Sequence, residues 1–321
     1  MQRLILIVST LALLGLAGFT IAGLFGPWSV VADAFTHLRV HLACVALILV
    51  GCTVWMNWQL ATVAVIICMV NLGLAFTYDR SPHVASSGGT PLKVMTVNVL
   101  HRVDNDDQIV AQIRAENPDV VFFQELIRAR QGLLKRLEAL YPWQISCTGA
   151  WRCDVAIISR HRWLMAQAQP VGESMTKLAW ARFGPELGGA LVASVHLKWP
   201  LISDQTAQLQ SVTNFLSSHP GPVIVAGDLN AVPWSAAVRS FTRQAHLNSA
   251  GGFVPTWPRR TFVQGAPCMI CIPQLQIDHV FVSPQFRVLS VRAGADVGSD
   301  HLPLIADLEL PRTLAAASSS P

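Results

Sequence analysis

The chain has 321 residues, of which 52% are hydrophobic and only 13% are charged, and its mean hydropathy is +0.42. This composition excludes an ordinary soluble protein, because soluble domains carry about 25% charged residues. The formal net charge of +4 neither requires nor excludes a nucleic-acid partner, since dedicated nucleic-acid binders usually concentrate basic residues on one face.

The apolar excess is confined to residues 1–90, which contain only five charged side chains: Arg3, Asp33, Arg39, Asp79 and Arg80. Three apolar runs lie there, at residues 4–24, 40–56 and 60–76. A bilayer-spanning helix needs about 17–25 residues, so each run is long enough. Asn57 interrupts the last two and tryptophans flank it, as in a tight turn at the membrane surface. We therefore predict a transmembrane region of about three helices over residues 1–78, in contact with the lipid bilayer.

The first apolar run has an alternative interpretation as a cleaved signal peptide that follows a short segment with Arg3. The run is longer than the usual ~7–15 apolar residues and no Ala-x-Ala site closes it, which favours a membrane helix. Both interpretations put the rest of the chain on the extracytoplasmic, periplasmic side of an inner or plasma membrane. The positive-inside rule disagrees, because Arg39 and Arg80 would then lie outside.

Cysteine placement bears on the compartment. Three cysteines lie in the apolar runs, and the other four form an even set outside them: Cys147, Cys153, Cys268 and Cys271. Spacings of six and three residues suit two small-loop disulfides in an oxidising compartment. The Cys-x-x-Cys spacing of the second pair also suits zinc, but the first pair lacks that spacing and no histidine partner is evident. We favour disulfides.

Residues 79–91 are rich in Ser, Gly and Pro, which indicates a linker. Residues 313–321 are rich in Ala and Ser, which indicates a disordered tail.

Residues 92–312 have ordinary charge density and enough length for one hydrophobic core. Short apolar or β-branched runs predict seven strands, at residues 92–97, 120–123, 155–158, 190–197, 223–226, 277–282 and 304–308. Helical spacing recurs between them, at residues 106–116, 126–140, 203–217 and 235–246. This alternation predicts an α/β domain.

Polar residues stand where the predicted strands begin or end. They are Asn98, Glu125, His196, Asp228 with Asn230, Asp278 with His279, and Asp300 with His301. Metal ligands and acid–base groups are best placed at such positions, because rigid strands fix their geometry. Each residue alone is explained equally well as a turn former or a surface residue. Their number and order indicate one converging site.

Six segments that contain these residues resemble, in order, the signature segments of the endonuclease/exonuclease/phosphatase (DNase I-like) family. They are Met-Thr-Val-Asn98, Phe-Gln-Glu125, Ser-Val-His196, Gly-Asp228-Leu-Asn230, Ile-Asp278-His-Val-Phe and Ser-Asp300-His301-Leu-Pro. The resemblance implies a four-layer α/β sandwich, here preceded by transmembrane helices, as in membrane-attached bacterial members. Residues 154–160 also resemble a family strand, but Asp154 stands where the family usually has Gly.

The resemblance also implies roles for these residues. Glu125, supported by Asn98 and Asp300, would hold Mg²⁺, with Mn²⁺ as an alternative, since hard oxygen ligands suit these ions. Asp228 would orient or deprotonate the attacking water, and Asn230 would donate a hydrogen bond to the phosphate. His301, oriented by Asp278, would act as a base or as a cationic phosphate ligand. His196 would contact the phosphate or the leaving group.

The expected function is a metal-dependent hydrolase that cleaves phosphodiester bonds outside the cytoplasm, in the manner of a nuclease. A phosphatase or phospholipase C-like enzyme acting on lipid or small-molecule phosphoesters is the alternative. A non-catalytic membrane scaffold is a third hypothesis, but a scaffold has no physical need for a full set of metal-binding and acid–base residues. The sequence shows neither a basic stripe for nucleic acid nor a lipid-binding hairpin, and no protein partner is evident.

Overall fold

The computed structural model describes residues 1–78, 80–147, 153–201, 204–259 and 274–310. It divides into two compact units. The helical unit consists of Met1–Tyr78 with Trp199–Thr206 and Ala231–Ser240. The sheet unit consists of Asp79–Lys198, Ala207–Asn230 and Phe241–Pro321.

The helical unit contains the membrane-length helices. Its elements are α1 (Gln2–Ala22), η1 (Gly23–Trp28), α2 (Val30–Ala34), η2 (Phe35–Leu38), α3 (Arg39–Thr53) and α4 (Trp58–Ala75). Three helical stretches are long and apolar enough to cross a membrane: Gln2–Trp28, Val30–Thr53 and Trp58–Ala75. Asn57 caps α4, because its side-chain oxygen accepts hydrogen bonds from the backbone N–H groups of Gln59 and Leu60 at 3.1 Å each. The three helices expected from the apolar runs are therefore present.

Buried polar contacts tie segments of the helical unit together. The Asn71 amide of α4 donates to Thr20 Oγ1 of α1 at 2.8 Å. Asp33 accepts hydrogen bonds from the backbone N–H groups of Ala236 (2.7 Å) and Ala237 (3.1 Å), which begin α8 (Ala236–Gln244). A carboxylate at a helix N-terminus satisfies free N–H groups and complements the helix dipole. Asp33 therefore serves as a distant cap for α8.

The sheet unit is built on two six-stranded sheets. The first has the order β11-β12-β1-β2-β4-β3 and the second β5-β6-β7-β8-β10-β9. The first sheet comprises β1 (Thr90–Asn98), β2 (Val120–Gln124), β3 (Trp143–Ser146), β4 (Ala156–Ser159), β11 (Arg287–Ala293) and β12 (Leu304–Leu310). The second comprises β5 (Trp163–Val171), β6 (Thr176–Phe183), β7 (Leu191–His196), β8 (Val223–Asp228), β9 (Asn248–Ser249) and β10 (Asp278–Val282). Strands β1 and β2 run parallel, as do β7 and β8.

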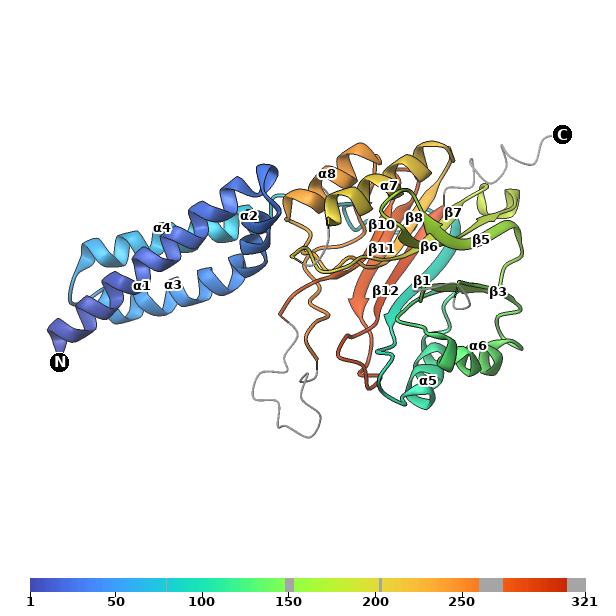
Figure 1. Cartoon of the computed structure of the whole chain (residues 1–321), viewed down its shortest axis with the longest axis horizontal. Helices are drawn as coiled ribbons and strands as arrows, with labels where there is room; N and C mark the ends of the chain where they lie inside the picture. The colour runs from blue at the N-terminus through green and yellow to red at the C-terminus, as the bar shows by residue number, and fades with distance from the viewer. Residues whose placement is uncertain (79, 148–152, 202–203, 260–273, 311–321) are drawn as a thin grey trace. The chain divides into compact units, whose positions relative to one another are not determined.

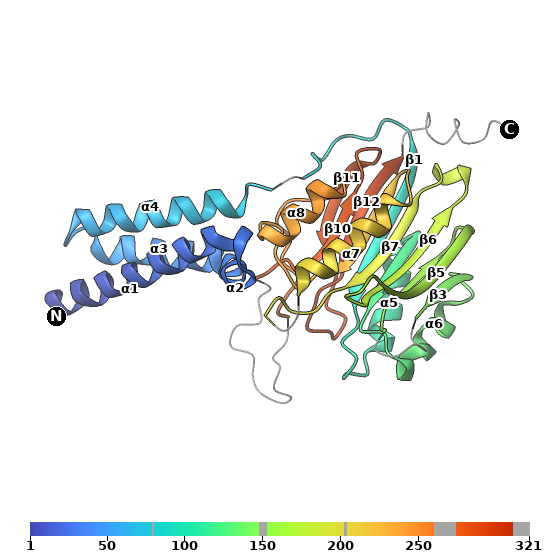
Figure 2. The same cartoon turned by 45° about the horizontal axis from the view of Figure 1, so that its top comes forward.

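Helices cover the outer faces of both sheets (Figure 1 and Figure 2). On the first sheet, Met95 and Val97 of β1 face α5 (Asp106–Glu116) and α6 (Gln131–Leu137). The alternate residues Leu92 and Val94 belong to the core that both sheets share. On the second sheet, α7 (Gln205–Ser217) and α8 pack through the aromatic pairs Phe215–Trp180 and Phe241–Phe281, with ring centroids 5.6 and 5.7 Å apart. The predicted four-layer α/β sandwich is confirmed.

All seven strands expected from the sequence are present, and five more were not expected: β3, β5, β6, β9 and β11. The helix expected at residues 126–140 is shorter, with η3 at Arg128–Arg130 followed by α6. The start of that segment is extended, because the Leu126 N–H donates to the Asp154 carbonyl (2.9 Å) rather than to a helical partner.

The expected linker at residues 79–91 lies against the sheet unit over part of its length. The Val84 N–H donates to the Val288 carbonyl at 3.0 Å, and the Ser87 N–H donates to Glu309 at 3.0 Å. Strand β1 begins within this segment, at Thr90. The linker boundary therefore stays a prediction, and the expected tail, residues 313–321, lies outside the described residues.

One of the two expected cysteine pairs lies within the described residues. Cys147 and Cys153 are disulfide-bonded and buried at the edge of the core between the sheets. Cys268 and Cys271 lie outside the described residues. Among the described cysteines, Cys44, Cys52 and Cys68 are free.

Candidate active site

The topology brings the polar strand ends to one edge of the two sheets. Asn98 ends β1 and Glu125 directly follows β2. These strands are parallel, so their carboxyl ends meet. In the second sheet, His196 and Asp228 end the parallel strands β7 and β8, and Asp278 begins the antiparallel strand β10 opposite Asp228.

One row of the second sheet carries four polar side chains in register. Lys177 of β6 pairs with His196, His196 with Asp228, and Asp228 with Asp278. Residues directly opposite each other on neighbouring strands share one face of the sheet. The row therefore presents one ammonium group, one imidazole and two carboxylates side by side.

A glycine permits the close approach of β7 and β8 beside this row. Gly227, which precedes Asp228, has φ +146°, and a Cβ added there would lie 2.0 Å from the Val195 carbonyl oxygen. No side chain fits at this position, because both the backbone conformation and the space exclude one.

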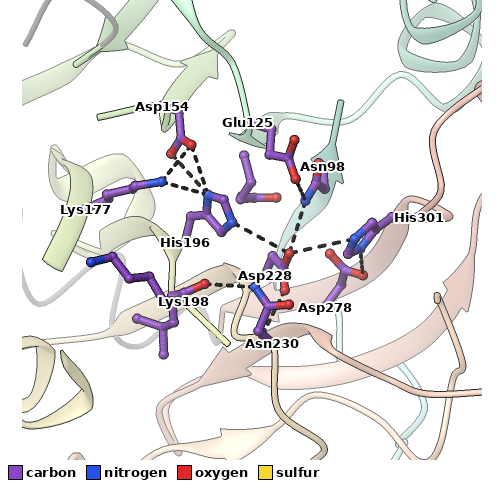
Figure 3. A network of polar contacts seen from close by, with 12 residues as sticks. Asn98, Glu125, Asp154, Lys177, His196, Lys198, Asp228, Asn230, Asp278 and His301 are labelled. Carbon is purple, nitrogen blue, oxygen red and sulfur yellow. Dashed lines mark hydrogen bonds and ion pairs between the residues drawn. The ribbon is translucent and has the colours of Figure 1, made fainter. Parts of the chain in front are cut away.

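Asp228 is the centre of the polar network (Figure 3). It is 1% exposed, and its Oδ2 accepts a hydrogen bond from the Asn98 amide at 3.0 Å. The same oxygen lies 3.9 Å from His196 Nε2 and 3.8 Å from His301 Nε2. Its other oxygen accepts the Asn230 backbone N–H at 2.8 Å. Burial raises the pKa of Asp228 to about 6, even though both imidazoles favour its charged form.

His301 is held by a carboxylate on the side away from Asp228. Its Nδ1 lies 2.8 Å from Asp278 Oδ2, and the Thr256 hydroxyl donates to the same oxygen at 2.6 Å. Burial works against a charged imidazole, but the carboxylates of Asp278 and Asp228 outweigh it and raise the pKa of His301 to about 10. His301 is therefore a cation at neutral pH in this arrangement.

His196 has a carboxylate partner of its own, Asp154, whose role the sequence did not reveal. His196 Nδ1 lies 3.1 Å from Asp154 Oδ1, and Lys177 Nζ donates to Asp154 Oδ2 at 2.7 Å. Burial alone would raise the pKa of Asp154, but His196 and Lys177 lower it to about 2. The departure at Asp154 thus supplies a second Asp–His pair. Only the β6–β7 register, which the sequence does not display, could have singled out Lys177.

The three expected metal ligands contact different members of the polar network. The Asn98 amide bridges Glu125 (3.2 Å) and Asp228. Asp300 lies on the His301 side, with Oδ1 4.0 Å from His301 Nε2 and Oδ2 accepting the Trp257 indole N–H at 3.4 Å. All eight expected site residues belong to one polar cluster. Among them, the Asn230 amide donates to the Leu197 carbonyl at 2.8 Å.

The donor set fits a divalent cation. Within the described residues, Asp278 Oδ1 and Asp300 Oδ1 are buried and accept no hydrogen bond. Buried carboxylate oxygens normally have a partner, so such atoms indicate an absent ion or water. Asp228, Asp278 and His301 also have ligand-type atoms within 4.8 Å of one another, but His301 would have to lose its proton before it could bind a metal ion.

Local backbone conformation helps to shape the site as well. Leu100, Glu125 and Asn230 all have positive φ, at +52°, +58° and +50°. Such conformations cost of order 1–3 kcal/mol in non-glycine residues and are found most often at functional sites. They turn the chain sharply after β1, β2 and β8, where the polar side chains must converge.

The Endonuclease/Exonuclease/phosphatase family model matches residues 95–301 of this sequence. The chain belongs to this family. Endonuclease/exonuclease/phosphatase proteins are hydrolases that act on phosphoesters, and the matched residues include all the polar strand ends described above.

Individual proteins and solved structures are similar to part or most of the chain. UPF0294 protein VP2298 of Vibrio parahaemolyticus is 31% identical over 111 residues, which cover 33% of this chain and 34% of that protein. The chain thus matches about a third of the length of this curated relative. The crystal structure of an endonuclease/exonuclease/phosphatase from Beutenbergia cavernae is 26% identical, with a TM-score of 0.54 over 69% of this chain and 72% of the other.

A third comparison shows likeness of fold. D. rerio TDP2, crystallised with a single-strand DNA product, is 20% identical, with a TM-score of 0.53. The likeness covers 68% of this chain and 99% of that one. It supports the sandwich architecture independently of the sequence motifs.

Proposed function

We propose that the protein is a membrane-anchored, metal-dependent phosphodiesterase that acts in the manner of a nuclease. The observation that carries this proposal is the arrangement around Asp228. A buried carboxylate faces two imidazoles at 3.8 and 3.9 Å, and each imidazole is oriented by a further carboxylate. Hydrolysis of a phosphodiester needs one base, one acid and a cationic environment for the phosphoryl oxygens.

Glu125, Asn98 and Asp300 are the residues that we assign to a divalent metal. Mg²⁺ or Mn²⁺, when bound, neutralises charge on the phosphoryl oxygens and orients the substrate. Glu125 is suited to be the principal ligand, since its carboxylate is only partly exposed and hydrogen-bonds to the Asn98 amide. The Asp300 Oδ1 atom, which accepts no hydrogen bond, is available for the same purpose.

The reaction then follows from proton positions. Asp228, whose pKa is raised to about 6, is ionised at neutral pH and basic enough to accept a proton from the attacking water. The water oxygen forms a bond to phosphorus as the bond to the leaving oxygen breaks. His196, protonated beside Asp154, gives its proton to the leaving oxygen. His301 and the Asn230 amide donate hydrogen bonds to the phosphoryl oxygens, whose negative charge increases in the transition state.

Nucleic acid outside the cytoplasm is the substrate class that we favour. The structurally similar TDP2 was crystallised with a single-strand DNA product, which supports this class by analogy of fold alone. The Cys147–Cys153 disulfide supports an oxidising compartment, since disulfides are rare in the cytosol. The three membrane-length helices support a multi-pass anchor.

A substrate panel tests the proposal on the full chain in detergent micelles. Plasmid DNA, RNA, sphingomyelin, phosphoinositides and a generic phosphodiester are each incubated with Mg²⁺ or with a chelator. We expect metal-dependent cleavage of nucleic acid that is lost in Glu125→Gln and kept in Glu138→Gln, which changes an exposed glutamate. Turnover confined to lipids would instead assign a phospholipase C-like activity, and inactivity on every substrate with bound metal would support the scaffold hypothesis.

A further inference from the structure

His101 contacts the principal metal-ligand candidate through two groups. Its backbone N–H donates to Glu125 Oε2 at 3.2 Å, and its Nδ1 is in direct contact with the same oxygen. The His101 side chain is 39% exposed, whereas the Glu125 side chain is 18% exposed. The imidazole is therefore more exposed to solvent than the carboxylate that it contacts.

A buried arginine fixes the loop that carries His101. Arg130 is 8% exposed, and its guanidinium donates to the carbonyls of Val99 (2.6 Å) and Leu100 (3.2 Å). It also donates to Asn105 Oδ1 at 2.6 Å and pairs with Asp106. The planar guanidinium has five N–H donors in a rigid arrangement, so it immobilises the loop at several points.

The loop also holds a strained conformation that directs His101 back to Glu125. Leu100 has φ +52°, an outlier for a bulky residue, and its N–H donates to Asn98 Oδ1 at 3.0 Å. Strain of this kind persists only where surrounding contacts enforce it. The backbone position of His101 is thus built into the fold, and it places the side chain beside Glu125.

We propose that His101 is a nitrogen ligand of the metal ion that Glu125 holds. The inference rests on the proposed function, because it concerns the same metal. His101 Nδ1 and Glu125 Oε2 are in contact, so both atoms would be within reach of one divalent ion. The neutral imidazole with Nδ1 unprotonated would be the form that binds, and any proton on Nδ1 would go to solvent.

A nitrogen ligand changes which metal the site prefers. Carboxylate and water ligands suit Mg²⁺ and Mn²⁺, whereas imidazole suits iron, nickel, copper and zinc ions. We therefore assign the site a metal preference shifted from Mg²⁺ toward the later first-row transition ions, with Mn²⁺ as the spectroscopic probe. Without metal ligation, His101 would only orient Glu125 by a hydrogen bond and would leave the metal preference unchanged.

Mn²⁺ binding to the full chain in detergent micelles tests this proposal without any substrate. Pulsed electron paramagnetic resonance detects nitrogen bound directly to Mn²⁺, and titration gives the dissociation constant. The variants are His101→Ala, Glu125→Gln and the matched control His161→Ala. His161 also pairs with a carboxylate, Asp119 (3.1 Å). It lies near the opposite end of β2 from Glu125, because the nearby Ser159 pairs with the first residue of β2, Val120.

We expect a nitrogen coupling that is lost in His101→Ala and kept in His161→Ala. The Mn²⁺ dissociation constant should rise in His101→Ala by at least the about 10- to 100-fold that loss of an outer-shell partner causes, with a smaller change for Mg²⁺. An unchanged nitrogen coupling in His101→Ala, or no nitrogen coupling in the wild type, would overturn the assignment of His101 as a ligand. If Glu125→Gln still abolished metal binding in that case, the proposed metal site itself would stand. Failure of the wild-type protein to bind either ion would overturn both. The exposed position of His101 favours normal folding of the variant, which thermal unfolding checks.

Discussion

At the scale of single residues, the two imidazoles beside Asp228 are similar in geometry but differ in surroundings. His301 and its partner Asp278 are almost fully buried, whereas Lys177 adds a cation beside His196 and Asp154. A carboxylate at one ring nitrogen fixes the tautomer and orientation of the other nitrogen. Both histidines therefore direct Nε2 to the same carboxylate, which is the arrangement that separate acid and phosphate-binding roles require.

Asp154→Asn tests whether Asp154 positions His196. Asp154 raises the pKa of His196, so its neutralisation should move the alkaline limb of the pH–rate profile to lower pH. We expect kcat to fall about 10- to 100-fold, less than the ~100- to 10,000-fold loss from removing a general acid such as His196 itself.

The matched control for this variant is Asp119→Asn. Asp119 forms the same kind of pair with His161 outside the proposed site, so its variant should retain the wild-type pH profile. Asp154→Glu should restore part of the rate. If Asp154→Asn left both kcat and the pH profile unchanged, Asp154 would have no part in positioning His196.

The charge of His301 gives a second prediction at this scale. Its folded-state pKa of about 10 lies above the unperturbed value of about 6.5. The resulting stabilisation is fully present below pH ~6.5 and is lost as pH rises through ~10. In the metal-free protein, ¹⁵N-histidine spectra, assigned with His301→Gln, should show a protonated imidazole at pH 8. A titration midpoint near 6.5 would contradict the proposed carboxylate environment.

The sequence motifs revealed the site residues that begin or end strands, because the order of these motifs along the chain matches the order in the family. Lys177 and His101 are different, since their contacts depend on strand register and on a turn with positive φ at Leu100. Neither feature has a local sequence signature. Asp154 was visible as a departure from the family pattern, but its meaning appeared only when the folded chain placed it beside His196.

At the scale of elements, the spacing between β7 and β8 depends on Gly227. Gly227→Ala would bring a Cβ to 2.0 Å from the Val195 carbonyl oxygen at φ +146°. We expect it to lower the free energy of unfolding by about 1–3 kcal/mol or more and to displace Asp228. Gly132→Ala is the control, because no atom lies within 4 Å of its added Cβ and alanine favours a helix by about 0.5–1 kcal/mol. Thermal unfolding of both variants measures the difference, and equal melting temperatures would contradict the close packing.

The strands that were predicted differ systematically from those that were missed. The predicted strands occupy inner positions in the two sheets, and β11, β3, β5 and β9 are the four sheet edges. Inner strands such as β2 and β8 are buried at every residue and so appear as continuous apolar runs. The edge strand β5 is partly exposed throughout and includes Pro170, which edge strands tolerate. In the inner strand β6, Lys177 and Arg182 interrupt the apolar pattern.

At the scale of the whole molecule, the orientation in the membrane is the point on which sequence signals disagree. Three spans with the N-terminus inside put the hydrolase domain outside, and the Cys147–Cys153 disulfide agrees. The basic residues Arg39 and Arg80 favour the opposite orientation under the positive-inside rule. Composition alone does not resolve this conflict, because few charges are available to count.

Fusion reporters at the C-terminus decide the orientation in a bacterial host. We expect alkaline phosphatase, which needs an oxidising compartment for its disulfides, to be active. Green fluorescent protein at the same position should be dark when exported by the same route. Bright fluorescence with inactive phosphatase would put the domain in the cytoplasm and would remove the support for an extracytoplasmic substrate.

Hydrolysis of a generic phosphodiester by the full chain in detergent micelles directly measures the proposed metal-dependent activity. We predict turnover with Mg²⁺ or Mn²⁺ that stops on addition of a chelator and returns with excess metal. Asp228→Asn should lower kcat at least about 100-fold, whereas Asp107→Asn, which changes a carboxylate that is 91% exposed on α5, should behave as the wild type. Turnover that persists in chelator, or in folded Asp228→Asn, would contradict the account.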